Sequence, residues 1–122
     1  MSKPYRVAVV GSRAFPRLME VKAFVHDLAV RAHALGEAIE IVSGGAPGVD
    51  IVAQTAAQDE GLGVKVFKAD WNRLGKAAGP IRNQEIVDYA DEVVAFWDGS
   101  SPGTKDTINR ANWARKPLTI RR

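Results

Sequence analysis

At 122 residues, with 46% hydrophobic and 25% charged side chains, the chain has the size and composition of one globular domain and not of a disordered segment. It contains no cysteine, which excludes a disulfide scaffold, a thiol nucleophile and a thiolate metal site and fits a reducing cytoplasm. The net charge of +3 suits an anionic ligand but falls short of the concentrated basic stripe of a dedicated nucleic-acid binder.

The first half of the chain alternates short β-branched runs with longer amphipathic segments. The short runs are apolar and end at glycine or at polar residues, as buried strands do. In the longer segments apolar residues recur at three- and four-residue spacing, which predicts helices. The predicted elements of this half are strands at 5–10, 38–43 and 64–68 and helices at 17–35 and 48–60.

The second half begins with an irregular stretch at 69–79 and then resumes the same alternation. A proline is well placed as the first residue of the next helix, because its missing N–H would have no helical acceptor there. This half predicts helices at 80–90 and 104–114 and strands at 91–97 and 117–120.

Strands that alternate with helices of this length form βαβ units and a parallel sheet. With right-handed crossovers, the favoured arrangement is a Rossmann-like three-layer α/β/α domain with a five-stranded sheet in the order 3-2-1-4-5. We expect residues 1–122 to form this single domain. The N-terminus lacks the apolar core of a signal peptide, and every apolar run is too short to span a bilayer, so we expect a soluble cytoplasmic protein without a membrane partner.

The turns after strands 2, 1 and 4 would lie side by side where the winding of this sheet reverses, which is where open parallel sheets bind ligands. All three turns contain glycine, which allows close approach of the backbone to a ligand, and unpaired amides near helix N-termini bind phosphate. We therefore predict a phosphate site. Its candidate residues in these turns are Gly11, Ser12, Arg13, Ser43, Gly44, Gly45, Ala46, Gly48, Asp98, Gly99, Ser101, Gly103 and Thr104.

Two further candidates, Arg82 and Asn83, fall in the first turn of the helix predicted to start at residue 80. A cation there opposes the helix dipole, and a bound anion would reverse that effect.

Three other candidate residues each have a structural alternative. Trp71 could stack on a base or close the core at the rim. Asp50 could bind a ribose hydroxyl or simply stabilise a helix N-terminus. Asp98 could hold a ribose or position a water molecule, although aspartate before glycine is also common in turns. We expect no metal and no cofactor.

These residues give the chain a family resemblance. The segments 11–13 (GSR), 43–50 (SGGAPGVD), 69–71 (ADW), 82–83 (RN) and 96–104 (FWDGSSPGT) resemble the SMF/DprA-LOG (SLOG) superfamily, in particular its YspA/YpsA-related branch. The resemblance covers nearly the whole chain. It implies a Rossmann-like domain that recognises a nucleotide or a nucleotide-derived ligand, and a homo-oligomer is compatible with it.

The relatives imply three functions. The first, which we favour, is binding or sensing of a nucleotide derivative without turnover. The second is a LOG-like phosphoribohydrolase that cleaves the N-glycosidic bond of a nucleoside 5′-monophosphate, with Arg82 and Asp98 as candidate catalytic residues. The glutamate of the LOG motif is Thr107 here, and a hydroxyl cannot replace an ionised carboxylate in that chemistry. Asp50 or Asp106 could supply the carboxylate instead.

The third function is DprA-like binding of single-stranded DNA. This needs a basic groove with aromatic platforms at intervals along it. The three tryptophans, Trp71, Trp97 and Trp113, fall on different predicted elements. We therefore place this function as the second alternative.

Overall fold

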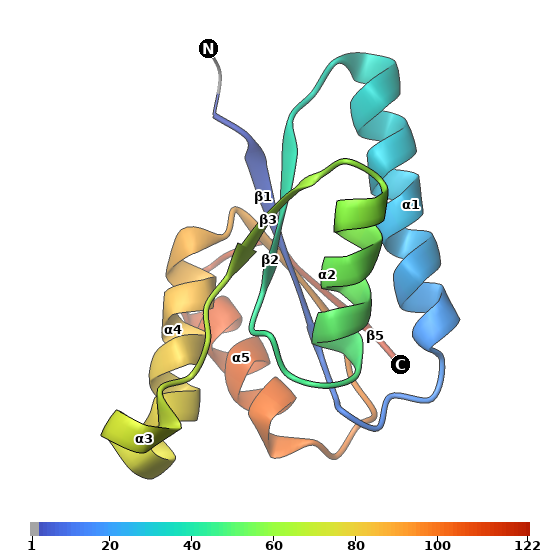
Figure 1. The fold of residues 1–122 in the computed structure, drawn as a ribbon. Helices are drawn as coiled ribbons and strands as arrows, with labels where there is room; N and C mark the ends of the chain where they lie inside the picture. The colour runs from blue at the N-terminus through green and yellow to red at the C-terminus, as the bar shows by residue number, and fades with distance from the viewer. Residues whose placement is uncertain (1–2) are drawn as a thin grey trace.

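The computed structural model describes residues 3–122, so the first two residues of the expected domain lie outside the described residues. The chain forms one parallel five-stranded sheet in the order β3-β2-β1-β4-β5, which confirms the predicted topology (Figure 1). The strands are β1 (Tyr5–Gly11), β2 (Ile39–Ser43), β3 (Gly63–Val66), β4 (Glu92–Phe96) and β5 (Leu118–Arg121).

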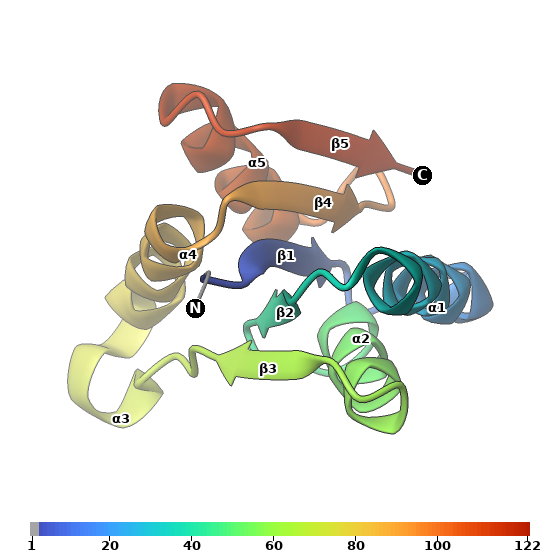
Figure 2. The same cartoon turned by 90° about the horizontal axis from the view of Figure 1, so that it is seen from above.

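Four long helices cover the sheet in pairs, with α1 and α2 on one face and α4 and α5 on the other (Figure 2). This is the predicted three-layer α/β/α arrangement. Over residues 3–122, no helix is long and apolar enough to cross a membrane. The helices are α1 (Leu18–Leu35), α2 (Val49–Asp59), α3 (Trp71–Leu74), α4 (Ala78–Tyr89) and α5 (Pro102–Trp113), with a 3₁₀ turn at Gly75–Ala77.

The central strands are buried on both faces, which explains why their sequences are continuously apolar. In β1, Val7 and Val9 join the core beneath α1 and α2, whereas Ala8 and Val10 join the core beneath α4 and α5. This packing fixes the carboxyl ends of β2, β1 and β4 next to one another. The loops that follow these three strands therefore meet at one edge of the sheet.

Two helices begin earlier than the sequence predicted. Helix α5 starts at Pro102, and α4 starts at Ala78, two residues before Pro80. A proline within the first turn is tolerated because the amides of that turn have no helical acceptor. The prediction that Arg82 lies in the first turn is therefore wrong, because it lies in the second turn, where the helix dipole acts less strongly on its charge.

Part of the stretch predicted to be irregular is also helical. Helix α3 is capped by the side chain of Asp70, which accepts a hydrogen bond from the Arg73 amide at 3.2 Å. Together with the 3₁₀ turn that follows, α3 leads directly into α4.

Candidate functional site

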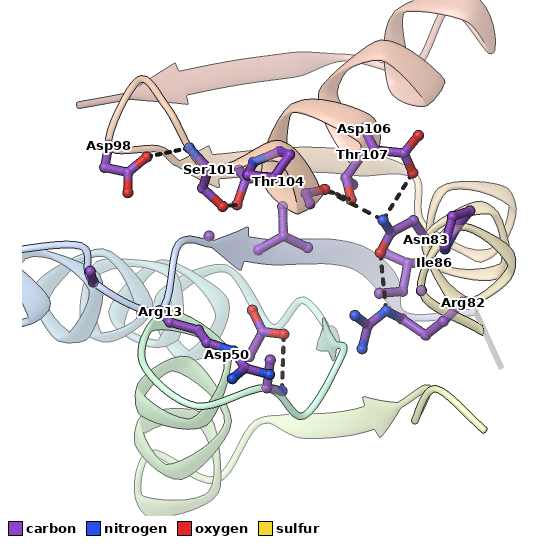
Figure 3. A pocket seen from close by; sticks show the side chains of 18 of the residues that line it. Arg13, Asp50, Arg82, Asn83, Ile86, Asp98, Ser101, Thr104, Asp106 and Thr107 are labelled. Carbon is purple, nitrogen blue, oxygen red and sulfur yellow. Dashed lines mark hydrogen bonds between the residues drawn. The ribbon is translucent and has the colours of Figure 1, made fainter. Parts of the chain in front are cut away.

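A pocket of about 660 Å³ lies at the edge of the sheet where the loops after β1, β2 and β4 meet (Figure 3). Its walls come from these loops, from α4 and from the start of α5. The structure brings together in this pocket the predicted residues Gly11, Arg13, Ala46, Asp50, Trp71, Arg82, Asn83, Asp98, Ser101, Gly103 and Thr104. Other predicted residues support the surrounding loops without lining the pocket, namely Ser12, Ser43, Gly44, Gly45, Gly48 and Gly99.

Arg13 is exposed at the side of the pocket and has no ion-pair partner within residues 3–122. The loop that carries it packs directly on the loop after β2. Gly48 makes this packing possible, because it has a φ of 88° and a Cβ atom there would lie 2.6 Å from the Arg13 carbonyl oxygen. The position of the Arg13 backbone therefore depends on a glycine in the neighbouring loop.

Arg82 reaches the pocket from α4 and is held by two neutral acceptors. Its Nη1 atom donates to the Gly44 carbonyl oxygen at 2.6 Å, and its Nε atom donates to Oδ1 of Asn83 at 3.0 Å. These bonds hold the guanidinium in place. In the described part of the chain no carboxylate forms an ion pair with it. Arg82 thus couples α4 to the loop after β2 and adds positive charge to the pocket.

Asp50 places a buried carboxylate beside this arginine, with only 5% of its surface exposed. Its Oδ2 atom accepts from the Ala46 amide at 3.2 Å, whereas Oδ1 has no partner among the residues described. Burial raises the pKa of the Asp50 carboxyl group to about 6, and the Ala46 amide and the Arg82 guanidinium oppose the shift. A Cβ atom at Gly44 would lie 2.6 Å from Arg82 Nη1 and 2.8 Å from Asp50 Oδ2, so the approach of all three groups requires glycine.

The prediction that the loop after β2 offers free amides to a phosphate is wrong at two positions. The Gly45 amide donates to the Ser43 hydroxyl at 3.1 Å, and the Ala46 amide donates to Asp50. Side chains of the same segment are close enough to satisfy these donors. Ser12 has a similar structural role, because its buried hydroxyl accepts from the Asp98 amide at 3.2 Å.

The start of α5 differs in this respect from the loop after β2. Its N-cap residue, Ser101, makes no side-chain capping hydrogen bond to the helix. The helix dipole therefore points its positive end into the pocket at Gly103 and Thr104. The space beside Gly103 is open, because a Cβ atom there would have no neighbour within 4 Å. An anion could therefore approach the first turn of α5 closely.

The loop before α5 is held by Asp98. Its Oδ1 atom accepts from the amides of Ser100 at 2.9 Å and Ser101 at 2.8 Å, which lowers the pKa of the carboxyl group. This is the turn chemistry that the sequence offered as the alternative to a functional role. Because Asp98 also lines the pocket, its second oxygen could still contact a ligand.

The wall between α4 and α5 contains a polar network that sequence reasoning only partly identified. Asn83 Nδ2 donates to Asp106 Oδ2 at 3.0 Å, and Arg110 Nε donates to the same oxygen at 2.8 Å. Asp106 is therefore committed to structure. Thr107, at the position of the LOG glutamate, is 3% exposed and donates to the Gly103 carbonyl oxygen at 3.3 Å.

The helical spacing of Thr104 and Thr107 could have placed Thr107 on the same face as the predicted site. The other lining residues that the prediction missed carry no polar side chain, and they are Val10, Ala14, Gly79, Pro80, Ile86 and Pro102.

Trp71 forms part of the rim and stays 55% exposed, so it does not close the core. Its ring lies over Gly79, where a Cβ atom would approach the ring to 3.1 Å. The ring is thus supported on one side by the backbone of α4, and much of its surface remains accessible to a planar ligand.

The sequence matches known proteins along most of its length. The family described as DNA recombination-mediator protein A matches residues 1–110. The Gene 61 protein of Mycobacterium phage D29 is 36% identical over an alignment of 120 residues, and the match covers 93% of this chain and 93% of that protein.

Solved structures share the fold. DNA processing protein A (DprA) from Streptococcus pneumoniae superposes with a TM-score of 0.78 at 24% identity, over 96% of this chain and 50% of that one. DNA processing protein A from Helicobacter pylori, whose structure concerns its single-stranded DNA binding mode, gives a TM-score of 0.68 at 22% identity. That match covers 96% of this chain and 65% of the H. pylori chain. The chain thus spans half the length of the pneumococcal protein. By the extent of these matches, the chain belongs to the DNA recombination-mediator protein A family, within the predicted SLOG superfamily.

Proposed function

We propose that the chain binds single-stranded DNA and that its pocket holds one backbone phosphate. The observation that carries this proposal is the uncapped start of α5, which faces the same pocket as Arg13 and Arg82. Family membership and the DNA-binding relative from H. pylori give it further support. The second alternative from the sequence thereby becomes our main hypothesis.

The pocket offers a phosphodiester complementary charge and donors. Within residues 3–122 no carboxylate pairs with the Arg13 guanidinium and no side chain of the N-cap residue caps α5, so both can act on a phosphate. The hydroxyl groups of Ser101 and Thr104 lie at the same helix end. Arg82 contributes mainly through its charge, because two of its nitrogens already donate to Gly44 and Asn83. A phosphodiester carries a single negative charge. The nearby Asp50 carboxylate therefore repels it less than it would repel a phosphate group with two charges.

Trp71 provides a surface for a base next to that phosphate. Single-stranded nucleic acids present unstacked bases, and stacking of one base on an aromatic side chain contributes roughly 1–3 kcal/mol. The half-exposed indole at the pocket rim fits this role. A duplex, whose bases are already stacked, would gain nothing from Trp71, so the pocket should favour single strands.

A mononucleotide carries the same two recognition elements as one unit of the strand. We therefore propose nucleotide binding, our first interpretation of the sequence, as a weaker form of the same interaction at the same pocket. It supplies one phosphate and one base, whereas a strand continues beyond the pocket.

The test measures fluorescence anisotropy of a labelled oligothymidylate over a range of salt concentrations. We expect salt-dependent binding that Arg13→Gln weakens about tenfold or more, because a hydrogen bond to a charged group contributes about 1.5–3 kcal/mol. The matched control is Arg115→Gln, which removes the same charge from an exposed residue beyond the far end of α5. Absence of binding, or equal losses in the two variants, would contradict the proposal.

A further inference from the structure

One buried side chain, that of Asn83, stands between Arg82 and the carboxylate of Asp106 (Figure 3). Its Oδ1 atom accepts from Arg82 Nε at 3.0 Å, and its Nδ2 atom donates to Asp106 Oδ2 at 3.0 Å. The same Nδ2 atom also donates to the Gly103 carbonyl oxygen at 3.4 Å. Asn83 is only 7% exposed. Both donors of the amide and its oxygen are therefore engaged within the protein.

The chemistry of the two neighbours fixes the direction in which this amide points. The Nε atom of an arginine can only donate, and a carboxylate can only accept. Oδ1 of Asn83 must therefore face Arg82, and Nδ2 must face Asp106. An amide can make both bonds at once, whereas a carboxylate at this position would lack the donor and a leucine would lack both groups.

Two neutral groups separate Arg82 from two carboxylates. On one side the amide of Asn83 lies between Arg82 and Asp106. On the other side Arg82 Nη1 donates to the Gly44 carbonyl oxygen, although Asp50 also approaches Gly44 closely. Within residues 3–122, Arg82 forms an ion pair with neither carboxylate.

Asp106 has a different arginine as its partner. Its Oδ2 atom accepts from Arg110 Nε at 2.8 Å, one turn further along α5. The negative charge of Asp106 is thus offset without Arg82. An ion pair between Arg82 and a carboxylate would use donors and charge that a phosphate in the pocket needs.

We propose that Asn83 is a positioning residue, which holds Arg82 at the pocket as an unpaired charge for the phosphate of the ligand. This inference rests on the proposed function and explains how one of its charges is kept available. The two residues are neighbours in the sequence and both are candidates for ligand binding, but they have different roles. Asn83 acts through Arg82 and not by a contact of its own.

The first test needs no ligand. Nitrogen-15 NMR measures how fast the Hε proton of Arg82 exchanges with water, and Arg82→Gln identifies its signal. Asn83→Leu removes the acceptor of this proton and should speed its exchange about tenfold. Arg17 provides the control, because its Nε atom donates to Glu20 at 3.1 Å and its exchange should stay the same.

The second test is a double-mutant cycle on binding of oligothymidylate. Asn83→Leu should weaken binding about fivefold in the unaltered chain, because Arg82 is no longer held in place. In the Arg82→Gln background it should weaken binding less than about twofold, because there is no guanidinium left to position. A residue that only supports the fold would weaken binding equally in both backgrounds.

A change of charge at the same position provides the third test. Asn83→Asp brings a carboxylate to Arg82 Nε and should weaken binding about tenfold. The matched control is Asn109→Asp, which makes the same change at an exposed residue of α5 outside the pocket. Asn83→Asp/Asp106→Asn keeps the net charge of the unaltered chain, avoids two adjacent carboxylates and should bind as weakly as Asn83→Asp.

The outcomes separate this inference from the proposed function. If the Hε exchange of Arg82 does not depend on Asn83, or if Asn83→Leu weakens binding equally in both backgrounds, the inference is overturned and the pocket stands. Equal binding by the Asn83→Asp and Asn109→Asp variants would overturn it as well. If the unaltered chain binds no single strand, the proposed function fails, and the exchange of the Arg82 proton still decides whether Asn83 positions this arginine.

Discussion

The Oδ2 atom of Asp50 accepts a hydrogen bond from the Ala46 amide at 3.2 Å, while Oδ1 of the same buried carboxylate has no partner in the part of the chain that the structure describes. The protein thus places a negative group of its own against a loop amide, at the edge of the proposed phosphate site. Because burial raises the pKa of Asp50 to about 6, both of its protonation states are accessible near neutral pH.

The first prediction concerns stability. The Asp50 pKa is 3.8 in the unfolded chain and about 6 in the folded one, so the folded state binds more protons in this range. Stability contributed by this group is therefore lost as pH rises from about 4 to about 6, by about 3 kcal/mol. Asp50→Asn stays neutral and can still accept from Ala46.

Urea denaturation of both proteins at several pH values measures this difference. Relative to the unaltered chain, Asp50→Asn should gain stability as pH rises through that range and show a constant advantage above it. A difference that does not change with pH would show that the carboxyl group does not titrate as its burial requires.

The second prediction links the same group to ligand binding. Ionised Asp50 repels a phosphate in the pocket, so affinity for single-stranded DNA should fall as pH rises through about 6. Asp98 also lines the pocket, but it does not produce this effect, because its hydrogen bonds to the Ser100 and Ser101 amides lower its pKa. Anisotropy titrations should find this pH dependence abolished in Asp50→Asn.

His26 provides the control for that experiment. Its hydrogen bond to Glu60 raises the pKa of the imidazole, but it lies on α1 and does not line the pocket. His26→Gln should leave the pH dependence of binding intact. If His26→Gln removes it and Asp50→Asn does not, the assignment to Asp50 is wrong.

The fold was predictable because its signals are local and repeated. Continuous apolar runs such as 5–10 predict strands buried on both faces, and the alternation with helices restricts the topology to few choices. The start of α4 was not predictable in the same way. Pro80 marked a first turn, but a proline is tolerated anywhere in that turn, so its position alone left the start uncertain by two residues.

The meeting of the three loops at one edge of the sheet was predictable, but the hydrogen bonds within them were not. Sheet topology brings the loops after β1, β2 and β4 together, and glycines mark them in the sequence. Which amides remain free depends on the path of each loop. Asp50 and Ser43 fold back onto the amides of Ala46 and Gly45, and this depends on backbone geometry that residue types do not specify.

The third prediction tests how the loops after β1 and β2 position Arg13. Gly48→Ala adds a Cβ atom 2.6 Å from the Arg13 carbonyl oxygen at a φ of 88°, so both strain and a clash result. Gly61→Ala is the matched control, because Gly61 has a φ of 76° and nothing within 4 Å of the added atom. Strain alone should cost about 1–3 kcal/mol, as measured by urea denaturation.

Gly48→Ala should therefore destabilise the chain more than Gly61→Ala does. It should also weaken binding of single-stranded DNA, because the clash displaces the backbone that carries Arg13. Equal effects of the two substitutions on stability and on binding would mean that the two loops can separate without consequence for the site.

The fourth prediction concerns the proposed base contact. Trp71→Ala removes the aromatic surface at the rim and should weaken binding of oligothymidylate by roughly 1–3 kcal/mol, the contribution of one stacked base. Trp71→Phe should keep most of the affinity, because a smaller ring can still stack. Trp113 supplies the control, since it is 91% exposed at the far end of α5 and lies outside the pocket.

Trp113→Ala should bind the strand as the unaltered chain does, and the thermal unfolding of each variant shows whether the fold survives. Each of these variants also lacks the fluorescence of one indole, so comparing them shows which indole responds to DNA. Quenching by DNA should persist in Trp113→Ala and be reduced in Trp71→Ala, since a base stacked on Trp71 would quench that indole directly. If quenching and affinity depend instead on Trp113, the strand runs along the outside of α5 and not across the carboxyl edge of the sheet.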